Sequence, residues 1–262
     1  MIQIELFGCT SAGKSSLLAN ILRACQDQGI EALTGDDLVL RQAGLNRVKN
    51  RLVRTLLTDW LALFACLLTC NRNLEFICFS IGTLLRLPAA VGWLERFNLA
   101  RNILKKVGMY EIIHRAGDNR QVAVVDEGTL QAAHNLFVHV SARMDPADVS
   151  TFVSLVPLPE LAVYVTQSKP VLIERTLARG HKRIPDTSYA NVECFISRAV
   201  DTFDQVVKHV ALKGRLLAIE PQQKSVASQD QPYLLPARVL EILRAEIDSA
   251  VVYASTISNP AL

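Results

Sequence analysis

The stretch GCTSAGKS, Gly8 to Ser15, matches the pattern G-x-x-x-x-G-K-[ST] at every fixed position. It follows the β-rich run from Ile2 to Phe7 and opens a segment to Gln28 whose apolar residues recur at helical spacing. A glycine loop between a strand and a helix can turn its backbone N–H groups inward around a phosphate. We therefore expect a phosphate cradle built by Gly8, Cys9, Thr10, Ser11, Ala12, Gly13, Lys14, Ser15 and Ser16.

Specific roles for three side chains follow from this pattern. Lys14 is expected to reach the β- and γ-phosphates of a nucleotide, and Ser15 to offer its hydroxyl to Mg²⁺. Asp126 ends the continuous apolar run from Val122 to Val125, so it stands at a strand tip where a carboxylate can hold Mg²⁺. The alternative is that Asp126 caps the helix that follows it.

Further strands and helices alternate along the chain, which predicts one α/β domain over residues 1–262 with a parallel sheet of about five strands. After the first strand, apolar runs of strand length occur at Ile30–Leu33, Val122–Val125, Leu161–Val165 and Leu216–Ile219. Ligands of such sheets bind at the carboxyl ends of the strands.

Helices are expected between and after these strands, separated by turn signals. The turns include Thr34-Gly35-Asp36-Asp37 and Gly117-Asp118-Asn119. The expected helices of the second half cover Thr129–Val140, a segment starting at Asp145-Pro146, Ser168–Gly180, a long stripe reaching Leu212, and Pro236–Val252 after a loop rich in Gln and Ser.

A helical insert over about residues 45–115 separates the second and third strands, with expected breaks near Asn71–Asn73, Pro88 and Asn98. Its apolar runs, Trp60–Asn71 and Phe76–Leu85, are shorter than the ~20 residues that a membrane-spanning helix needs. We expect buried core helices here. A membrane partner is therefore not expected, and a homodimer through the apolar helices is an alternative use of them.

Basic residues gather at two places. Arg175, Arg179, Lys182 and Arg183 lie around the end of a helix and could neutralise a transferred phosphoryl group, although charge runs are often only solvated. Arg47, Arg51 and Arg54 recur at helical spacing and could hold a substrate phosphate, or form an exposed stripe.

Three carboxylates complete the candidate site. Asp36 and Asp37 follow the second strand, where one of them could accept a proton from an acceptor hydroxyl or simply form the turn. Glu127 could orient a water or a substrate, or start an exposed helix.

Composition limits the classes of partner. A net charge of +3 is too mild for a binder of duplex nucleic acid. Six cysteines without paired spacing, and an N-terminus that enters a strand directly, indicate a reducing, cytoplasmic setting.

The order of motifs resembles the thymidylate kinase and deoxynucleoside kinase branch of the P-loop kinases. After the loop, the second segment that resembles this family is LAVYVTQSKPVLIERTLARG, Leu161 to Gly180. It is similar to the family's strand, to the arginine-bearing helix that follows that strand, and to the start of the family's lid. The resemblance implies a three-layer P-loop NTPase fold, nucleotide contacts from Arg175, and a lid over about residues 179–188 carrying Arg179 and Arg183. TGDD, Thr34 to Asp37, stands in place of the family's acidic motif, whereas Glu127 replaces the family's arginine.

The expected function is therefore Mg²⁺-dependent transfer of the γ-phosphoryl group of ATP to a small acceptor. The first candidate for that acceptor is a nucleoside or a nucleoside monophosphate. Arg47, Arg51 and Glu127 are the candidate substrate-binding residues. The alternative is an ATPase switch or assembly protein that binds a partner through its apolar insert. A GTPase is not favoured, because the guanine-reading Asn-Lys-x-Asp element has no match.

Overall fold

A computed structural model describes residues 1–262 except 117–120, 185, 187 and 221–262. In that part, strands and helices alternate as the sequence predicts. The elements are β1 Ile2–Phe7, α1 Lys14–Asp27, β2 Ala32–Thr34, α2 Gly35–Gln42, α3 Arg51–Leu68, the 3₁₀ turn η1 Cys70–Arg72, α4 Leu74–Leu85, α5 Trp93–Arg115, β3 Val122–Asp126, α6 Ala132–Phe137, α7 Pro146–Leu155, β4 Leu161–Val165, α8 Lys169–Arg179, α9 Tyr189–Lys208, the 3₁₀ turn η2 Val210–Leu212 and β5 Leu216–Ile219.

The described strands form one all-parallel sheet in the order β2-β3-β1-β4-β5. The expected parallel sheet of about five strands is confirmed. β1 lies in the middle, and every residue of β1 and β4 is buried, as expected for strands covered on both faces. Because all strands run the same way, their carboxyl ends meet at one edge, and the loop after β1 lies between those after β3 and β4.

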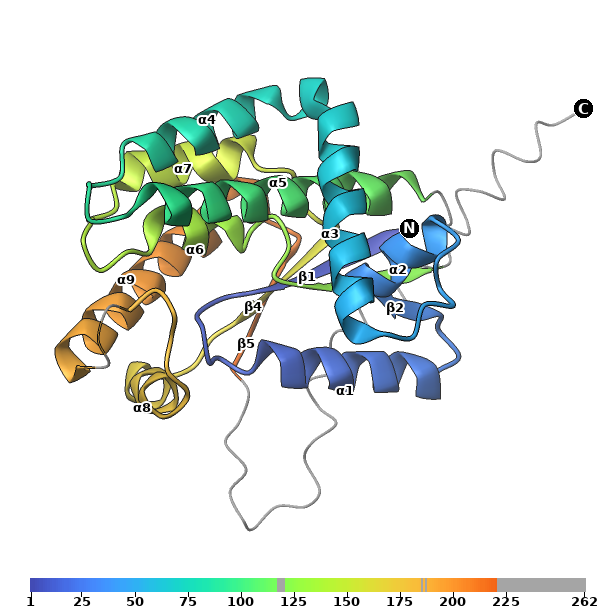
Figure 1. The fold of residues 1–262 in the computed structure, drawn as a ribbon. Coiled ribbons are helices and arrows are strands. Elements are labelled where there is room, and N and C mark those ends of the chain that lie inside the picture. Colours follow the sequence, from blue (N-terminus) through green and yellow to red (C-terminus); the bar gives the residue numbers. More distant parts are fainter. Residues whose placement is uncertain (117–120, 185, 187, 221–262) are drawn as a thin grey trace, which may run out of the picture.

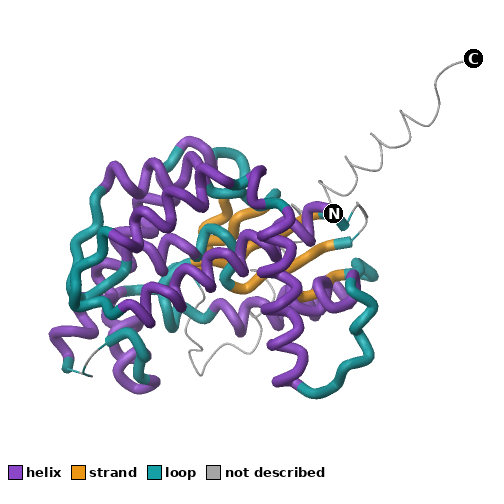
Figure 2. The backbone as a smooth tube through the Cα atoms, turned by 45° about the horizontal axis from the view of Figure 1, so that its top comes forward, coloured by secondary structure: helices purple, strands orange, loops and turns teal. Residues whose placement is uncertain are grey.

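Helices cover both faces of this sheet, which makes a three-layer α/β arrangement (Figure 1). α1 lies along one face and contacts β1, β2 and β3. α5, α6, α7 and α9 gather on the other face, where α6 and α7 both pack against α9. Figure 2 shows the strands enclosed between these helices.

The helical insert between the second and third strands is present as α2 to α5, with two corrections at its start. Thr34-Gly35-Asp36-Asp37 does not form a turn, because Thr34 Oγ1 accepts the N–H of Asp37 at 3.1 Å and caps α2. Arg47 does not share a helix with Arg51, since α3 begins only at Arg51, with Asn50 as its cap.

Further along the insert, the breaks near Asn71–Asn73 and Pro88 are confirmed, whereas the break near Asn98 is wrong. α5 continues through Asn98 to Arg115. The helix is held there by burial of Leu99 and Ile103 in the main core, which outweighs the weak helix preference of one asparagine.

The interpretation of the insert as buried core is only half right. α3 packs one side closely on α5, where a Cβ on Gly108 would lie 1.7 Å from the carbonyl oxygen of Ala62, so only glycine allows this approach. The opposite side of α3 is apolar but exposed, with Trp60 72% and Leu67 70% accessible. Figure 1 shows α3 crossing α5 on the outside of the helical layer.

In the second half of the chain, most expected elements are confirmed. β4 and β5 have the expected bounds, and α7 begins at Pro146 with Asp145 capping Ala147. The helix expected over Thr129–Val140 is shortened to α6, Ala132–Phe137, and Val210 is exposed in η2 rather than on the buried stripe of α9. The turn at Gly117–Asn119 and the helix at Pro236–Val252 lie outside the described residues.

A membrane-spanning helix is not found in the part of the chain that the structure describes, because none of its helices is both long and apolar enough.

Candidate functional site

The loop after β1 has the backbone that the glycine pattern predicts. Gly8, Ser11 and Gly13 all have positive φ angles, of 139°, 62° and 99°. A Cβ on Gly8 would lie 2.4 Å from the carbonyl oxygen of Val165 in β4, so a side chain would push the loop off the sheet. The N–H of Gly8 is itself fixed by a 2.9 Å hydrogen bond to Oε1 of Gln131. The loop is therefore held from β4 and from the segment that precedes α6.

Lys14 begins α1 and folds back over this loop. Its side chain is only 6% exposed, and its Nζ donates to the carbonyl oxygens of Gly8 at 3.2 Å and Cys9 at 3.0 Å. Oε1 of Glu127 lies 3.7 Å from the same nitrogen. A buried ammonium group is thus held at the mouth of the loop mainly by backbone oxygens, which phosphate oxygens can replace.

Ser15 and Asp126 meet beside this ammonium group. Ser15 Oγ donates to Asp126 Oδ2 at 2.8 Å, which joins the start of α1 to the tip of β3. Asp126 Oδ1 is buried and has no hydrogen-bond partner among the described residues. Burial raises the pKa of Asp126, while the Ser15 hydroxyl opposes that shift. A buried carboxylate oxygen without a partner is costly unless a cation or a water completes its contacts.

The residues present fit a magnesium ion at this point. Mg²⁺ prefers oxygen ligands and is commonly bound by one or two side chains, with phosphates and waters completing the octahedron. A hydroxyl and a carboxylate in contact are such a pair. No group of three or more His, Cys, Asp or Glu side chains suited to a metal occurs among the described residues.

Glu127 has a strained backbone. Within the described residues, Ser11 and Glu127 are the only non-glycine residues with positive φ, 62° and 67°, and both line the pocket over the loop after β1. The carbonyl of Glu127 accepts a hydrogen bond from Lys106 of α5. Burial would raise the pKa of Glu127, but Lys106 and Lys14 outweigh it and the pKa is lowered. Strain of this kind is typical of functional loops.

A pocket of about 330 Å³ opens over the loop, lined by residues 10–16 together with Glu127, Arg175 and Arg179. Arg175 donates to the carbonyl oxygen of Ser11 at 3.3 Å, and the hydroxyl of Thr176 lies 3.3 Å from that of Ser11. α8 therefore brings two of the predicted arginines to the loop.

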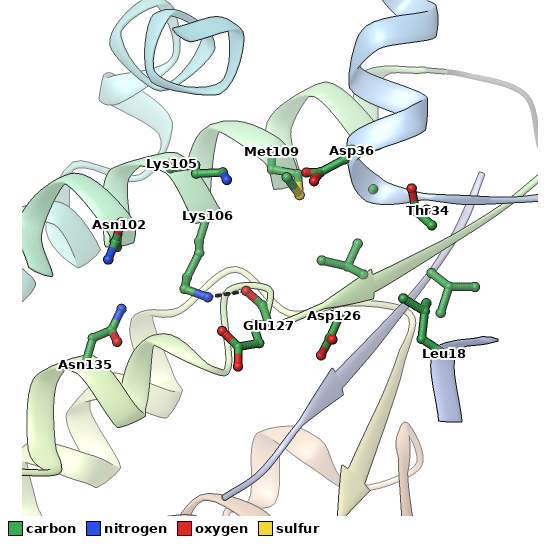
Figure 3. A pocket seen from close by; sticks show the side chains of 13 residues that line it. Leu18, Thr34, Asp36, Asn102, Lys105, Lys106, Met109, Asp126, Glu127 and Asn135 are labelled. Atoms are coloured by element: carbon green, nitrogen blue, oxygen red, sulfur yellow. Dashed lines mark hydrogen bonds between the residues drawn. The ribbon is translucent and has the colours of Figure 1, made fainter. Parts of the chain in front are cut away.

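A second pocket of about 400 Å³ lies next to the first and shares Glu127 with it. Figure 3 shows Lys105, Lys106 and Asn102 entering from α5 and Asn135 from α6, with Asp36 on the far side. Burial lowers the pKa of Lys106, and the carboxylates of Glu127 and Glu5 oppose that shift. The pocket thus offers cationic and amide groups near the tip of β3.

The two predicted aspartates after β2 face different surroundings. Asp36 lines the 400 Å³ pocket, and burial raises its pKa. Asp37 pairs with Arg54 and accepts the hydroxyl proton of Thr34 at 2.7 Å, so it holds α2 and α3 together. Asp36 therefore borders a pocket, whereas Asp37 is used in contacts that hold α2 and α3 together.

Other predicted basic residues lie away from the two pockets. Arg183 is turned toward the end of α6, where its Nη2 donates to the carbonyl oxygen of Val138 at 2.5 Å. Lys182 lines neither pocket, and the same is true of Arg47 and Arg51, which are exposed before and at the start of α3. The segment expected as a lid is thus anchored at Arg183.

Sequence reasoning missed several site residues. Lys105, Lys106 and Asn102 come from a helix far along the chain, and no motif marks them. Glu5 and Gln131 form a support for the loop: Gln131 donates its N–H to Glu5 Oε1 at 3.0 Å and accepts the N–H of Gly8. The one signal in the sequence is the carboxylate of Glu5 inside a strand whose other residues, apart from Gln3, are apolar.

Comparison with known proteins adds no family assignment: no protein-family model matches the chain, and no curated protein sequence matches it.

Proposed function

We propose that this chain is a P-loop phosphotransferase that uses Mg²⁺ and ATP to phosphorylate a small acceptor, with a nucleoside or nucleoside monophosphate as the first candidate. The observation that carries the proposal is the contact between Ser15 and Asp126 beside Lys14. It joins a glycine loop, a buried ammonium group and a half-satisfied carboxylate at the carboxyl edge of a parallel sheet.

The roles of the loop residues follow from their positions. Inward N–H groups of the loop and the Lys14 ammonium would bind the β- and γ-phosphates. Ser15 and Asp126 would hold the metal ion, whose positive charge offsets the negative charge on the phosphates. Arg175 and Arg179 line the same pocket and would neutralise charge on the transferred group.

The acceptor would lie in the 400 Å³ pocket. The acceptor oxygen, a hydroxyl oxygen of a nucleoside or a phosphate oxygen of a nucleoside monophosphate, forms a bond to the γ-phosphorus, the bond from that phosphorus to the β-γ bridging oxygen breaks, and ADP leaves. Only the hydroxyl carries a proton that a base must remove. Asp36 would take the hydroxyl proton, and its raised pKa suits a base that must accept one. Lys105, together with Asn102 and Asn135, would position the acceptor.

A second candidate is hydrolysis of ATP without an acceptor, as in a nucleotide-dependent switch. The observation in its favour is Glu127, whose carboxylate lines both pockets and lies 3.7 Å from Lys14. The lowered pKa keeps this carboxylate ionised, so it could orient a water for attack.

The experiment measures ADP release with a panel of nucleosides, nucleoside monophosphates and sugars, and follows the acceptor by mass spectrometry. A phosphotransferase releases ADP in proportion to a phosphorylated acceptor. The alternative outcome is ADP release that no acceptor stimulates and that the Glu127→Gln substitution abolishes. That result would support ATP hydrolysis without an acceptor. A lack of ATP binding by the intact chain would remove both.

Matched variants locate the chemistry. Asp126→Asn should lower Mg²⁺-dependent turnover by about a hundredfold, whereas Asp201→Asn on the exposed side of α9 should not. Asp36→Asn should lower transfer to the acceptor and spare ATP binding. Asp37→Asn should lower stability through loss of the Arg54 pair, and an equal loss of transfer from both variants would remove Asp36 as the base.

A further inference from the structure

The exposed side of α3 is an apolar stripe along the whole helix. Leu56, Trp60 and Phe64 follow one another at four-residue spacing and are 60%, 72% and 60% exposed. The stripe is extended at both ends by Leu52, Val53, Leu67 and Leu68. A helix that is apolar on every side normally lies in a protein interior, so a stripe of this length indicates something that covers it.

The fold does not need this stripe. α3 already buries Thr58, Ala62 and Cys66 against α5, and its position is fixed by the close approach at Gly108. Exposed apolar side chains continue beyond α3 on the same insert, at Leu74 and Leu85 of α4 and at Trp93, Leu94 and Phe97 of α5. Figure 1 shows α4 starting where α3 ends, both at the outside of the helical layer.

The charge of the insert is opposite in sign to that of the rest of the chain. Residues 47–115 hold eleven Lys or Arg and four Asp or Glu, while the whole chain has a net charge of +3, so the remainder is net acidic. Arg47, Lys49 and Arg51 lie exposed at one end of the stripe, and no described carboxylate pairs with them. Arg72, 58% exposed, lies at the other end, where its Nη1 is 3.7 Å from Oε2 of the buried Glu111.

Acidic groups are few along the stripe. Asp59 is the single carboxylate of α3, and it is turned inward, where Lys105 at 2.5 Å and Arg101 at 3.5 Å pair with it. Glu75 at the start of α4 is exposed. The surface is therefore apolar in the middle and cationic at the N-terminal end of α3, whereas Arg72 at the other end is balanced by Glu111 and Glu75.

This distribution of charge and apolar side chains favours some binding partners of the stripe over others. A second copy of the chain, packed stripe to stripe in parallel, would bring the cationic N-terminal ends of the two α3 helices together, and like charges oppose that contact. A protein partner normally makes about one hydrogen bond per 100–200 Å² of interface, yet Thr55 is the one uncharged polar side chain on the exposed side of α3.

A bilayer surface needs no such hydrogen bonds. Tryptophan and leucine side chains enter the boundary between headgroups and acyl chains, and lysine and arginine attract anionic headgroups. We propose that α3, with its flanking cations, docks the chain in the plane of an anionic phospholipid membrane surface without spanning it. This proposal stands apart from the phosphotransferase reaction, because the stripe contributes no residue to either pocket.

The test is flotation of the full chain with phosphatidylcholine vesicles, with and without phosphatidylserine. We expect binding to the phosphatidylserine vesicles that weakens as salt rises. The combined change Leu56→Gln, Trp60→Gln and Phe64→Gln should weaken it by about tenfold or more. A control pair, Tyr189→Gln with Val210→Gln, removes exposed apolar side chains outside the insert and should bind like the parent.

A second variant tests the charges separately. Arg47→Glu, Lys49→Glu and Arg51→Glu should remove the preference for phosphatidylserine while circular dichroism stays unchanged, because all three side chains are exposed. In a Trp93→Phe background, the emission of Trp60 should shift to shorter wavelength on addition of the anionic vesicles.

Three outcomes would overturn the proposal. The first is no binding to either vesicle, and the second is binding that the stripe substitutions leave unchanged. The third is a dimer in sedimentation velocity that the stripe substitutions dissolve, which would identify a second copy as the occupant. Failure here would leave ATP binding intact, so it is distinguishable from failure of the proposed reaction.

Discussion

Lys14 and Arg183 are both buried cations near the carboxyl edge of the sheet, yet they differ in what surrounds them. Lys14 contacts two carbonyl oxygens of its own loop and borders a pocket of about 330 Å³. Arg183 reaches the carbonyl oxygens of His134 and Val138 and the rings of His134 and His139, and lines neither site pocket.

This difference suggests separate roles for the two cations: Lys14 in binding a ligand, and Arg183 in stabilising the fold. The oxygens around Lys14 belong to a loop that phosphate oxygens can enter, so its charge is available to a ligand. Arg183 ties α6 to the segment before α9, and its guanidinium lies 5.8 Å from the centre of the Phe195 ring. The two Nη groups of Arg183 are used by the fold, and its Nε lies 3.7 Å from Oε1 of Glu95, so this cation contributes to stability and lines neither of the two site pockets.

The largest expected effect is a loss of ATP turnover on substitution of Lys14. If the proposed function holds, Lys14→Ala should lower turnover of ATP by about a thousandfold, because no other described ammonium group lines the pocket over the loop after β1. The measurement is ADP release at saturating ATP. Lys208→Ala, at the exposed end of α9, is the control and should leave turnover unchanged. Full turnover by Lys14→Ala would remove the contrast between the two cations.

The reverse effect is expected at Arg183. Arg183→Ala should lower the free energy of unfolding by about 3 kcal/mol, since it leaves buried carbonyl and imidazole groups without their donor. Urea unfolding measures the loss, and nucleotide affinity should stay near that of the parent. A variant of normal stability that loses ATP affinity would instead return Arg183 to a lid role.

The next largest expected effect is a loss of stability at acid pH, caused by the histidines around Arg183. Burial and, second to it, the nearby Arg183 guanidinium lower the pKa of His139 and of His181 to about 4, whereas the unfolded value is 6.5. Arg198 also faces His139, and Arg179 and Glu127 face His181. The folded state thus binds fewer protons than the unfolded state between these values, so stability falls as the pH drops from 6.5 to 4.

We expect each of the two histidines to contribute about 2 kcal/mol over this range, read from urea unfolding at a series of pH values. His139→Gln should flatten the dependence, and His114→Gln on α5 should leave it unchanged. An equally steep loss in His139→Gln would show that other groups cause it.

The smallest expected effect is a gain in the free energy of unfolding, and it concerns Glu5, which supports the loop after β1 through Gln131. Burial raises the pKa of Glu5 to about 7 from 4.5, against hydrogen bonds from Gln131 and Thr129 and the charge of Lys106. Its protonated form is favoured in the fold, so its contribution is full below 4.5 and is lost as the pH rises through 7. Glu5→Gln should therefore raise the free energy of unfolding at pH 8 by about 1 kcal/mol.

The control for that substitution is Glu174→Gln on the exposed side of α8, which should change nothing. A loss of stability in Glu5→Gln at pH 8 would mean that the ionised carboxylate is needed to hold Gln131 and, through it, Gly8.

Local sequence signals were reliable where the chemistry is local. The glycine loop, the strand ended by Asp126, the Asp145 cap and the bounds of β4 and β5 all follow from neighbouring residues. The wrong or shortened elements, at Asn98, Thr34–Asp37 and Thr129–Val140, are places where burial or a cap outside the pattern decides the conformation.

The sequence by itself determined the all-parallel sheet and the loop that begins α1, because repeating hydrophobicity and glycine backbone freedom act over a few residues. Only the tertiary structure decided which charges meet: Ser15 with Asp126, Arg54 with Asp37, Lys106 with Glu127, and Arg183 with the histidines. It also decided that the outer side of α3 is exposed, since an apolar pattern shows that a side chain avoids water but not what covers it.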